Sequence, residues 1–356
     1  MSDPKPYEKA KVKIKNGEAE IEAVISAEMM QVHIDAVRED VRQEFSLPGF
    51  RKGQVPVDIM RQHVTDADLM QDAADLALGE SYPAILESEK LEPMGRPRVT
   101  ITKLAAGNPL EFKIEVPVVP EFSLPDYKKI GKKIVEEERP VEVADDEVNE
   151  TVESIRKMRA SSSDGKTPET LPELTDELAK TFGHFENVAD FRTKVKESLK
   201  EEKGAAVGQK RREAIAARLI EETKLTIPES AVAEELLAMT ERRHEDAKKM
   251  NVSMEEYLKR LGKTEAELIK DEKEYIERQA KTRLILDRIA RQEHIEIDPA
   301  ELQGQAEYLA RRYPDTDPER VRDYVETLLM NEKTLELIEG KEPATTSEVS
   351  APKEEK

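Results

Sequence analysis

The sequence lacks cysteine and tryptophan, and aromatic residues make up only 4% of its 356 residues. Without cysteine the chain cannot form a disulfide, a thiolate zinc site or a cysteine nucleophile, although this absence does not indicate a cellular compartment. No apolar run approaches the ~18 residues that a membrane-spanning helix requires. These absences exclude disulfide-stapled scaffolds, cysteine-ligated zinc proteins and helical membrane proteins.

Motifs of nucleotide, metal and nucleophilic chemistry are also missing. The sequence has no G-x-S-x-G, P-loop, G-x-G-x-x-G or H-E-x-x-H motif. Its histidines are scattered, and none pairs at helical spacing with another histidine or joins an acidic cluster of metal-ligand type: His33, His63, His184, His244 and His294. We therefore predict no metal and no other cofactor, and the local residues do not indicate an enzyme.

Charged residues, by contrast, are abundant. They make up 38% of the chain, with a net charge of -20, a composition typical of long, solvated helices. The length favours two or three domains. The negative charge argues against broad nucleic-acid binding but allows a local basic contact. Because the first residues, MSDPKPYEKAKVKIKNG, lack the apolar segment of a secretory signal, we expect a soluble cytoplasmic protein.

The N-terminal segment predicts a β-hairpin with a defined register. Lysines alternate with apolar residues over 11–15, and glutamates alternate with apolar residues over 18–22. Asn16-Gly17 between them is the favoured two-residue turn, because both positions need positive φ. Folding about this turn places Lys15 opposite Glu18 and forms an ion-pair ladder on one face. The other face carries Val12, Ile14, Ala19 and Ile21.

Residues 1–115 as a whole predict a small α+β domain. Three helical stretches follow the hairpin, the first capped by Ser26 and the second beginning at Pro56. The third contains Pro83, where we expect a kink or a break. Alternation of apolar residues then returns twice, so the element order is β-β-α-α-α-β-β.

The rest of the chain predicts an extended, mostly α-helical C-terminal domain. A connector over 116–170 contains a helix at about 145–159 and a linker rich in Ser, Gly and Pro. Residues 171–342 have helical patterns throughout, and residues 343–356 form a polar tail that we expect to be disordered. The helix start signals in this domain are Ser253-x-x-Glu256, Thr264-x-x-Glu267, Asp298-Pro299 and Asp317-Pro318.

The stretch FSLPGFRKGQVP, residues 45–56, is unusual in so acidic a chain. Pro and Gly on both sides fix a tight loop between helices, and its tip displays Phe50, Arg51 and Lys52 with no acidic residue in the stretch. Arg can make bidentate bonds to phosphate or carboxylate, and Phe can stack or fill a pocket. The stretch therefore indicates either a contact for an anionic, partly apolar surface or a connector with Phe50 tucked into the domain.

This stretch resembles the ribosome-docking signature of trigger factor, a family of bacterial ribosome-associated chaperones. Residues 91–122 are similar to the end of the family's docking domain, and residues 171–183, LPELTDELAKTFG, resemble the opening of its C-terminal domain. The resemblance implies a docking domain over 1–115 and a helical chaperone domain, the cradle, over 171–342. The residues that carry the signature, and that the resemblance assigns to ribosome binding, are Gly49, Phe50, Arg51, Lys52, Gly53 and Pro56.

The resemblance also implies the partners of the protein. They are the large ribosomal subunit at the exit tunnel, through protein and rRNA, and nascent and unfolded polypeptides. A weak homodimer off the ribosome is implied as well, and no membrane. The client surface must be apolar yet adaptable, which suits flexible methionine side chains. Met239, Met250 and Met254 cluster around one expected helical hairpin and are the candidate client-binding residues, with ordinary core packing as the alternative.

The sequence departs from the family where a prolyl isomerase domain of the FK506-binding kind is typically inserted. Only ASSSDGKTPET stands between the helix ending near Arg159 and LPELTDELAK, whereas a self-standing domain needs ~50 residues or more. We therefore expect an ATP-independent chaperone without isomerase activity, in a form that is either naturally short or an engineered deletion. The alternatives are a peptidyl-prolyl isomerase, a ribosome-independent holdase and a helical scaffold.

Overall fold

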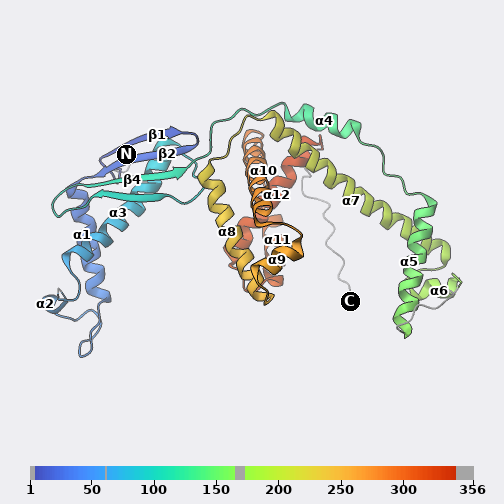
Figure 1. Cartoon of the computed structure of the whole chain (residues 1–356), viewed down its shortest axis with the longest axis horizontal. Helices are drawn as coiled ribbons and strands as arrows, with labels where there is room; N and C mark the ends of the chain where they lie inside the picture. Colours follow the sequence, from blue (N-terminus) through green and yellow to red (C-terminus); the bar gives the residue numbers. More distant parts are fainter. Residues whose placement is uncertain (1–4, 61, 165–172, 342–356) are drawn as a thin grey trace. The chain divides into compact units, whose positions relative to one another are not determined.

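The computed structural model describes residues 5–60, 62–164 and 173–341 (Figure 1). Contacts within the chain divide it into two compact units, each built from two separate stretches of sequence. The stretches are Met1–Ser123 with Lys224–Leu284 in the first unit, and Leu124–Thr223 with Ile285–Lys356 in the second.

The first unit contains a four-stranded antiparallel sheet. Its strands are β1 (Lys9–Lys15), β2 (Glu18–Ile25), β3 (Arg98–Lys103) and β4 (Leu110–Pro117). Their order across the sheet is β1-β2-β4-β3. The N-terminal hairpin therefore pairs through β2 with β4, the last of the four strands in the sequence. β1 and β3 form its two edges.

The hairpin has the register that the sequence predicts. Lys15 lies opposite Glu18, and the pairing continues in that register along both strands. The Asn16-Gly17 turn has positive φ at both positions, which confirms its type. The charged face extends further than expected, because Glu20 on β2 reaches across to Lys113 on β4, with 3.3 Å between Nζ and Oε1.

Helices α1 (Ala27–Glu44) and α3 (Asp66–Glu89) cover one face of this sheet, and the short α2 (Val57–Met60) lies between them in sequence (Figure 1). Alternate residues of β2 and β4 are buried against these helices. Ile14, which the sequence also places on this face, is exposed because β1 is an edge strand. The largest fully buried side chains of this core are Ile21, Ile25, Ile85, Leu110, Ile114 and Val116.

Helix α3 runs through Pro83 without interruption, so the expected break is wrong. Pro83 removes one backbone hydrogen bond, to the carbonyl of Gly79, and a proline inside a helix costs ~3 kcal/mol. Leu78 and Ile85, on either side of it, are both buried in the core. Burial of two large apolar side chains contributes about 1.5–3 kcal/mol each, which is enough to hold both halves of the helix in place.

The second stretch of the first unit is helical. Its helices are α8 (Glu229–Lys249), α9 (Met254–Leu261) and the first part of α10 (Glu265–Gln292). The expected helix starts are confirmed at Ser253, whose side chain caps α9, and at Thr264, which exchanges hydrogen bonds with Glu267. Arg243 on α8 and Glu272 on α10 form an ion pair with both side chains largely buried.

The described regular secondary structure of the second unit is all helical. Helix α5 extends to Asp164, past the helix end expected near Arg159. Residues 165–172 of the expected linker and the tail at 343–356 lie outside the described residues. Besides the end of α10, the helices are α4 (Tyr127–Glu137), α5 (Asp145–Asp164), α6 (Asp176–Thr181), α7 (Val188–Glu222), α11 (Pro299–Arg312) and α12 (Pro318–Ile338).

Two separate clusters of apolar side chains stabilise this unit. Helices α5, α6 and α7 meet around Phe191, whose ring centroid lies 4.9 Å from that of Phe185 and 5.3 Å from that of Phe182. Val325 and Leu329 of α12 pack in one cluster with residues of α11. Both helices begin at the expected Asp-Pro pairs. The predicted fold class, an α+β N-terminal domain followed by a mostly α-helical part, is confirmed.

Candidate functional site

The loop between α1 and α2, residues 45–56, is called the tip loop, and two glycines set its path. Gly49 and Gly53 have φ of 98° and 76°, values that residues with side chains rarely adopt. The backbone N–H of Gly53 donates to the carbonyl of Phe45 at 3.1 Å, which returns the loop to the end of α1. A Cβ at Gly53 would also lie only 3.0 Å from the carbonyl oxygen of Gln43. Pro56 stands just before α2, where its carbonyl accepts the first hydrogen bonds of that helix.

The tip loop has a buried side and an exposed side. Val55, near its end, and Met60, in α2, are buried and anchor it to the domain. Phe50 is 41% exposed, and Arg51 and Lys52 are exposed beside it. The structure therefore displays all three side chains together and does not tuck Phe50 into the domain core.

The two cations of the tip loop have different surroundings. The Nζ atom of Lys52 lies 2.7 Å from a carboxylate oxygen of Glu44, on the last turn of α1. Among the described residues, no ion pair or side-chain hydrogen bond engages Arg51. Its guanidinium is thus available for a bidentate contact with a phosphate or a carboxylate. Sequence reasoning missed the contact with Glu44, because that residue precedes the stretch that drew attention.

The candidate methionines lie on α8 and α9. Met250 directly follows α8 and is 51% exposed, whereas Met239 and Met254 are half-buried. Met250 and Met254 flank the short turn between the two helices. Met239 lies about 16 Å from Met250 along α8, at a rise of ~1.5 Å per residue. The structure therefore places two of the three methionines at the same end of this helix pair and the third farther along it.

Helix α9 is amphipathic but incompletely covered. Its apolar residues Met254, Tyr257, Leu258 and Leu261 have the i, i+3, i+4, i+7 spacing of one helix face. None of them is buried, and Leu261 is 48% exposed. An apolar face that the described part of the chain covers only partly is a candidate for binding a partner. The spacing was visible in the sequence, but the extent of the cover was not, because it depends on how neighbouring helices pack.

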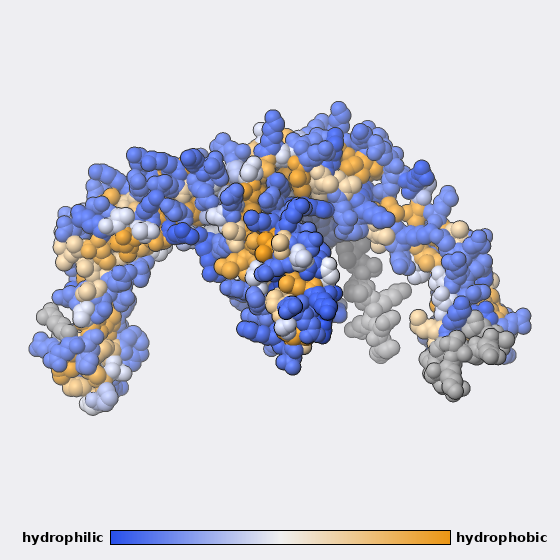
Figure 2. All heavy atoms as spheres, in the orientation of Figure 1, coloured by the Kyte–Doolittle hydropathy of each residue, from blue (hydrophilic) through white to orange (hydrophobic). Residues whose placement is uncertain are grey.

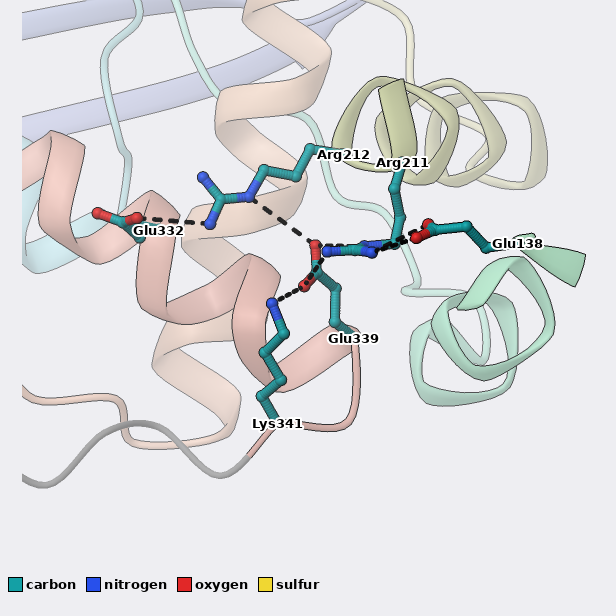
Figure 3. Close-up of polar contacts among 6 residues, drawn as sticks. All are labelled: Glu138, Arg211, Arg212, Glu332, Glu339 and Lys341. Carbon is teal, nitrogen blue, oxygen red and sulfur yellow. Dashed lines mark hydrogen bonds and ion pairs between the residues drawn. The ribbon is translucent and has the colours of Figure 1, made fainter. Parts of the chain in front are cut away.

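A buried charge cluster connects helices of the second unit (Figure 3). The side chain of Glu339, just after α12, is fully buried, and its oxygens lie 3.1 Å from Nε of Arg211 and 2.6 Å from Nζ of Lys341. Arg211, on α7, also donates from Nη1 to both carboxylate oxygens of Glu138 at 2.9 Å. Glu138 caps the end of α4, so one guanidinium links α7 to two other helix ends.

The charges of this cluster support one another. Burial alone would raise the pKa of Glu339, but Lys341 and Arg211 outweigh it and hold that pKa below its ordinary value of 4.5. Beside the cluster, the backbones of α4 and α12 pack closely. A Cβ added at Gly131 of α4 would lie only 1.8 Å from the carbonyl oxygen of Ile338. The cations and carboxylates engage one another, so we interpret the cluster as structural and not catalytic.

Metal sites and membrane-spanning helices are absent from the described part of the chain. Within the described ranges, no three His, Asp or Glu side chains are placed to share a metal ion. Nor is any described helix long and apolar enough to cross a lipid bilayer. On the face drawn in Figure 2, apolar patches lie among hydrophilic side chains.

Two models of one protein family match this sequence. One, described as bacterial trigger factor protein, matches residues 8–155, and one described as the C-terminus of the same protein matches residues 187–340. Together they cover most of the chain, including the tip loop and helices α8 and α9. Only residues 156–186 lie between the two matched regions.

Curated relatives and a solved structure are similar over nearly the whole chain. The trigger factor of Nocardioides sp. is 22% identical, covering 94% of this chain and 88% of its own length. That of Clostridium beijerinckii is 24% identical, with 93% and 99% covered. These alignments run over 420 and 426 residues, so the relatives contain residues without a counterpart among the 356 here. A solved structure from work on promiscuous substrate recognition by the trigger factor chaperone is similar in fold, with a TM-score of 0.55, 18% identity, and 94% of this chain and 99% of that chain covered.

Proposed function

This chain belongs to the trigger factor family of chaperones, and from that premise we propose that it docks on the ribosome and shields nascent or unfolded polypeptides without ATP. The observation that carries the proposal is the tip loop, where Phe50 is exposed beside the guanidinium of Arg51, which no described side chain engages. The proposed partner is the large ribosomal subunit beside the exit tunnel, through both protein and rRNA. Such docking requires a cytoplasmic location.

Electrostatics support docking through the tip loop in preference to another surface. The chain carries a net charge of -20, which repels an anionic assembly over most of its surface. The tip loop is a basic exception. Once docked, even a weak client-binding surface works at a high effective concentration beside the emerging polypeptide. Off the ribosome we expect the weak self-association that the family resemblance implies.

Co-sedimentation with ribosomes tests this proposal. The full chain, without nucleotide, should pellet with purified large subunits and not with small subunits. Raised salt should weaken the binding, since contacts between exposed charges are screened. A chain that stays in the supernatant at low salt but still prevents aggregation would instead be a ribosome-independent holdase.

We assign client binding to the open face of α9 together with Met250 and Met254. Met250 and Leu261 are about half exposed, so they present apolar surface that no other part of the described chain covers. Flexible methionines adapt to unrelated apolar segments, and exposed apolar surface marks interaction sites. Met239, half-buried and farther along α8, contributes at the margin of this surface.

The chain should suppress aggregation of an unfolded protein with no ATP present, as measured by light scattering. Replacing Met250 and Leu261 together by Ser should raise the amount of chaperone needed roughly fivefold, since losing about 1 kcal/mol of apolar contact corresponds to that factor. Met158→Ser, which changes an exposed methionine on α5, is the matched control. Equal effects of the two variants, or a strict requirement for ATP, would contradict the assignment.

We also propose that the chain has no prolyl isomerase activity. Residues 156–186, between the two matched regions, are too few for a self-standing domain of ~50 residues, and part of them already belongs to α5 and α6. A proline-peptide isomerisation assay should therefore give the uncatalysed rate. A faster rate that an inhibitor of FK506-binding-type isomerases abolishes would refute this.

A further inference from the structure

Glu44 is the acidic residue that the structure brings to the tip loop. It lies eight positions before Lys52 in the sequence, yet its Oε2 atom is 2.7 Å from the lysine Nζ. The backbone brings the two together, because the hydrogen bond from Gly53 N–H to the carbonyl of Phe45 folds the loop back onto the end of α1. Both side chains remain largely exposed, at 75% for Glu44 and 58% for Lys52, so the pair faces solvent where a partner would arrive.

Glu39, another acid on the same turns of α1, is engaged elsewhere. Glu39 lies 3.3 Å from Nε of Arg42 and accepts a hydrogen bond from the amide of Gln43 at 3.0 Å. Its charge is therefore compensated within the helix and is not directed at the loop. Among the described acids, including Asp40 on the same helix, only Glu44 forms an ion pair with a cation of the tip loop.

We infer that Glu44 competes with the ribosome for Lys52 and thereby sets the affinity of docking, an inference that rests on the proposed function. An anionic group of the large subunit that approaches Lys52 must share its ammonium with the carboxylate or displace it. The tip loop consequently docks with Arg51 fully available and Lys52 partly neutralised. The weaker contact at Lys52 favours release of the protein from the ribosome.

Removing the charge of Glu44 is expected to strengthen ribosome binding, whereas most substitutions at a binding site weaken it. Glu44→Gln keeps the shape of the side chain and removes its charge, so the dissociation constant for purified large subunits should fall about two- to fivefold at low salt. That is the range that an exposed ion pair can supply. Glu39→Gln makes the same change in net charge five residues earlier and should leave the dissociation constant unchanged.

The same Glu44→Gln substitution in a chain that also lacks Lys52 distinguishes an effect of the Glu44–Lys52 ion pair from a general effect of net charge. In a Lys52→Gln chain, Glu44→Gln should tighten binding much less than in the parent, because the competition has been removed. The measurement is a co-sedimentation titration with purified large subunits. Unchanged binding by Glu44→Gln would overturn the inference. Weaker binding would overturn it too, because it would mean that the ion pair orders the loop for docking. An equal gain from Glu39→Gln, or an undiminished gain in the Lys52→Gln background, would overturn it too. Failure of the parent chain to bind would instead overturn ribosome docking, and the inference with it.

Discussion

Replacement of Phe50, Arg51 and Lys52 together by Ala is expected to lower the affinity for ribosomes more than a hundredfold while leaving the fold intact. A hydrogen bond to a charged group contributes roughly 1.5–3 kcal/mol, and binding energy concentrates in a few aromatic and Arg residues. A loss of about 3 kcal/mol exceeds a hundredfold at ~1.4 kcal/mol per tenfold. The fold should survive because all three side chains project from a loop.

A matched control for this variant lies at the end of α11. Arg311, Arg312 and Tyr313 are two cations and one aromatic, all exposed, and their joint replacement by Ala removes the same charge. Co-sedimentation at two salt concentrations, together with circular dichroism, compares the two variants. Parent-like binding by the tip-loop variant would mean that the loop is only a connector. A loss of helical signal would mean that the three side chains are needed for folding, contrary to their exposure.

Replacement of Arg211 by Met is expected to lower the free energy of unfolding by about 3–5 kcal/mol, the usual cost of removing one partner from a buried ion pair. The guanidinium is the shared partner of Glu138 and Glu339. Its loss leaves the buried carboxylate of Glu339 with less compensation and removes the link from α7 to the ends of α4 and α12. Urea denaturation of the two proteins measures the difference.

Arg218→Met is the control on the same helix. Arg218 pairs with Glu221 and Glu222 at 2.7 Å in each case, but all three side chains are substantially exposed. Exposed pairs contribute only about 0–1 kcal/mol, so this variant should be nearly as stable as the parent. Equal destabilisation by the two substitutions would show that the buried ion pairs of Arg211 contribute no more to the free energy of unfolding than the exposed pairs of Arg218.

The contribution of Glu339 should depend on pH. Its pKa is held below the ordinary value of 4.5 in the folded chain, so the folded state favours the carboxylate form. The resulting stabilisation is fully present above pH 4.5 and is lost as the pH falls through the lowered pKa. The stability difference between the parent and Glu339→Gln should therefore be largest near neutral pH and shrink in acid. A constant difference from pH 7 to pH 3, measured by urea denaturation, would contradict this.

The elements that the sequence predicts correctly are those that local signals specify. The Asn16-Gly17 turn determines the hairpin register, and Ser26 caps α1 through the backbone N–H of Met29. The break, one of the two expectations at Pro83, does not occur, because burial of Leu78 and Ile85 on either side overrides a local preference. Turn and cap chemistry depend on a few neighbouring residues, whereas the fate of a mid-helix proline depends on the whole core.

The site divides in the same way. Phe50, Arg51 and Lys52 are contiguous, so their joint display at a loop was predictable from Pro and Gly around them. The contact between Glu44 and Lys52 depends on the loop folding back, and the link between Arg211 and Glu339 joins residues far apart in the sequence. No periodicity or motif marks such pairs. Side-chain partners chosen by tertiary packing are therefore the part that a single sequence does not show.

The edge strand β1 carries lysine at every second position, and all four of these side chains are exposed: Lys9, Lys11, Lys13 and Lys15. An open sheet edge presents unpaired backbone groups to which an extended polypeptide can add as another strand. A protein that keeps unfolded chains nearby is unusually exposed to that reaction, in which its own clients would become part of its sheet. The lysine row makes addition to β1 costly, and at the opposite edge a register shift between Ile101 and Lys103 interrupts β3. The sheet thus avoids templating the aggregation that the rest of the chain is proposed to prevent.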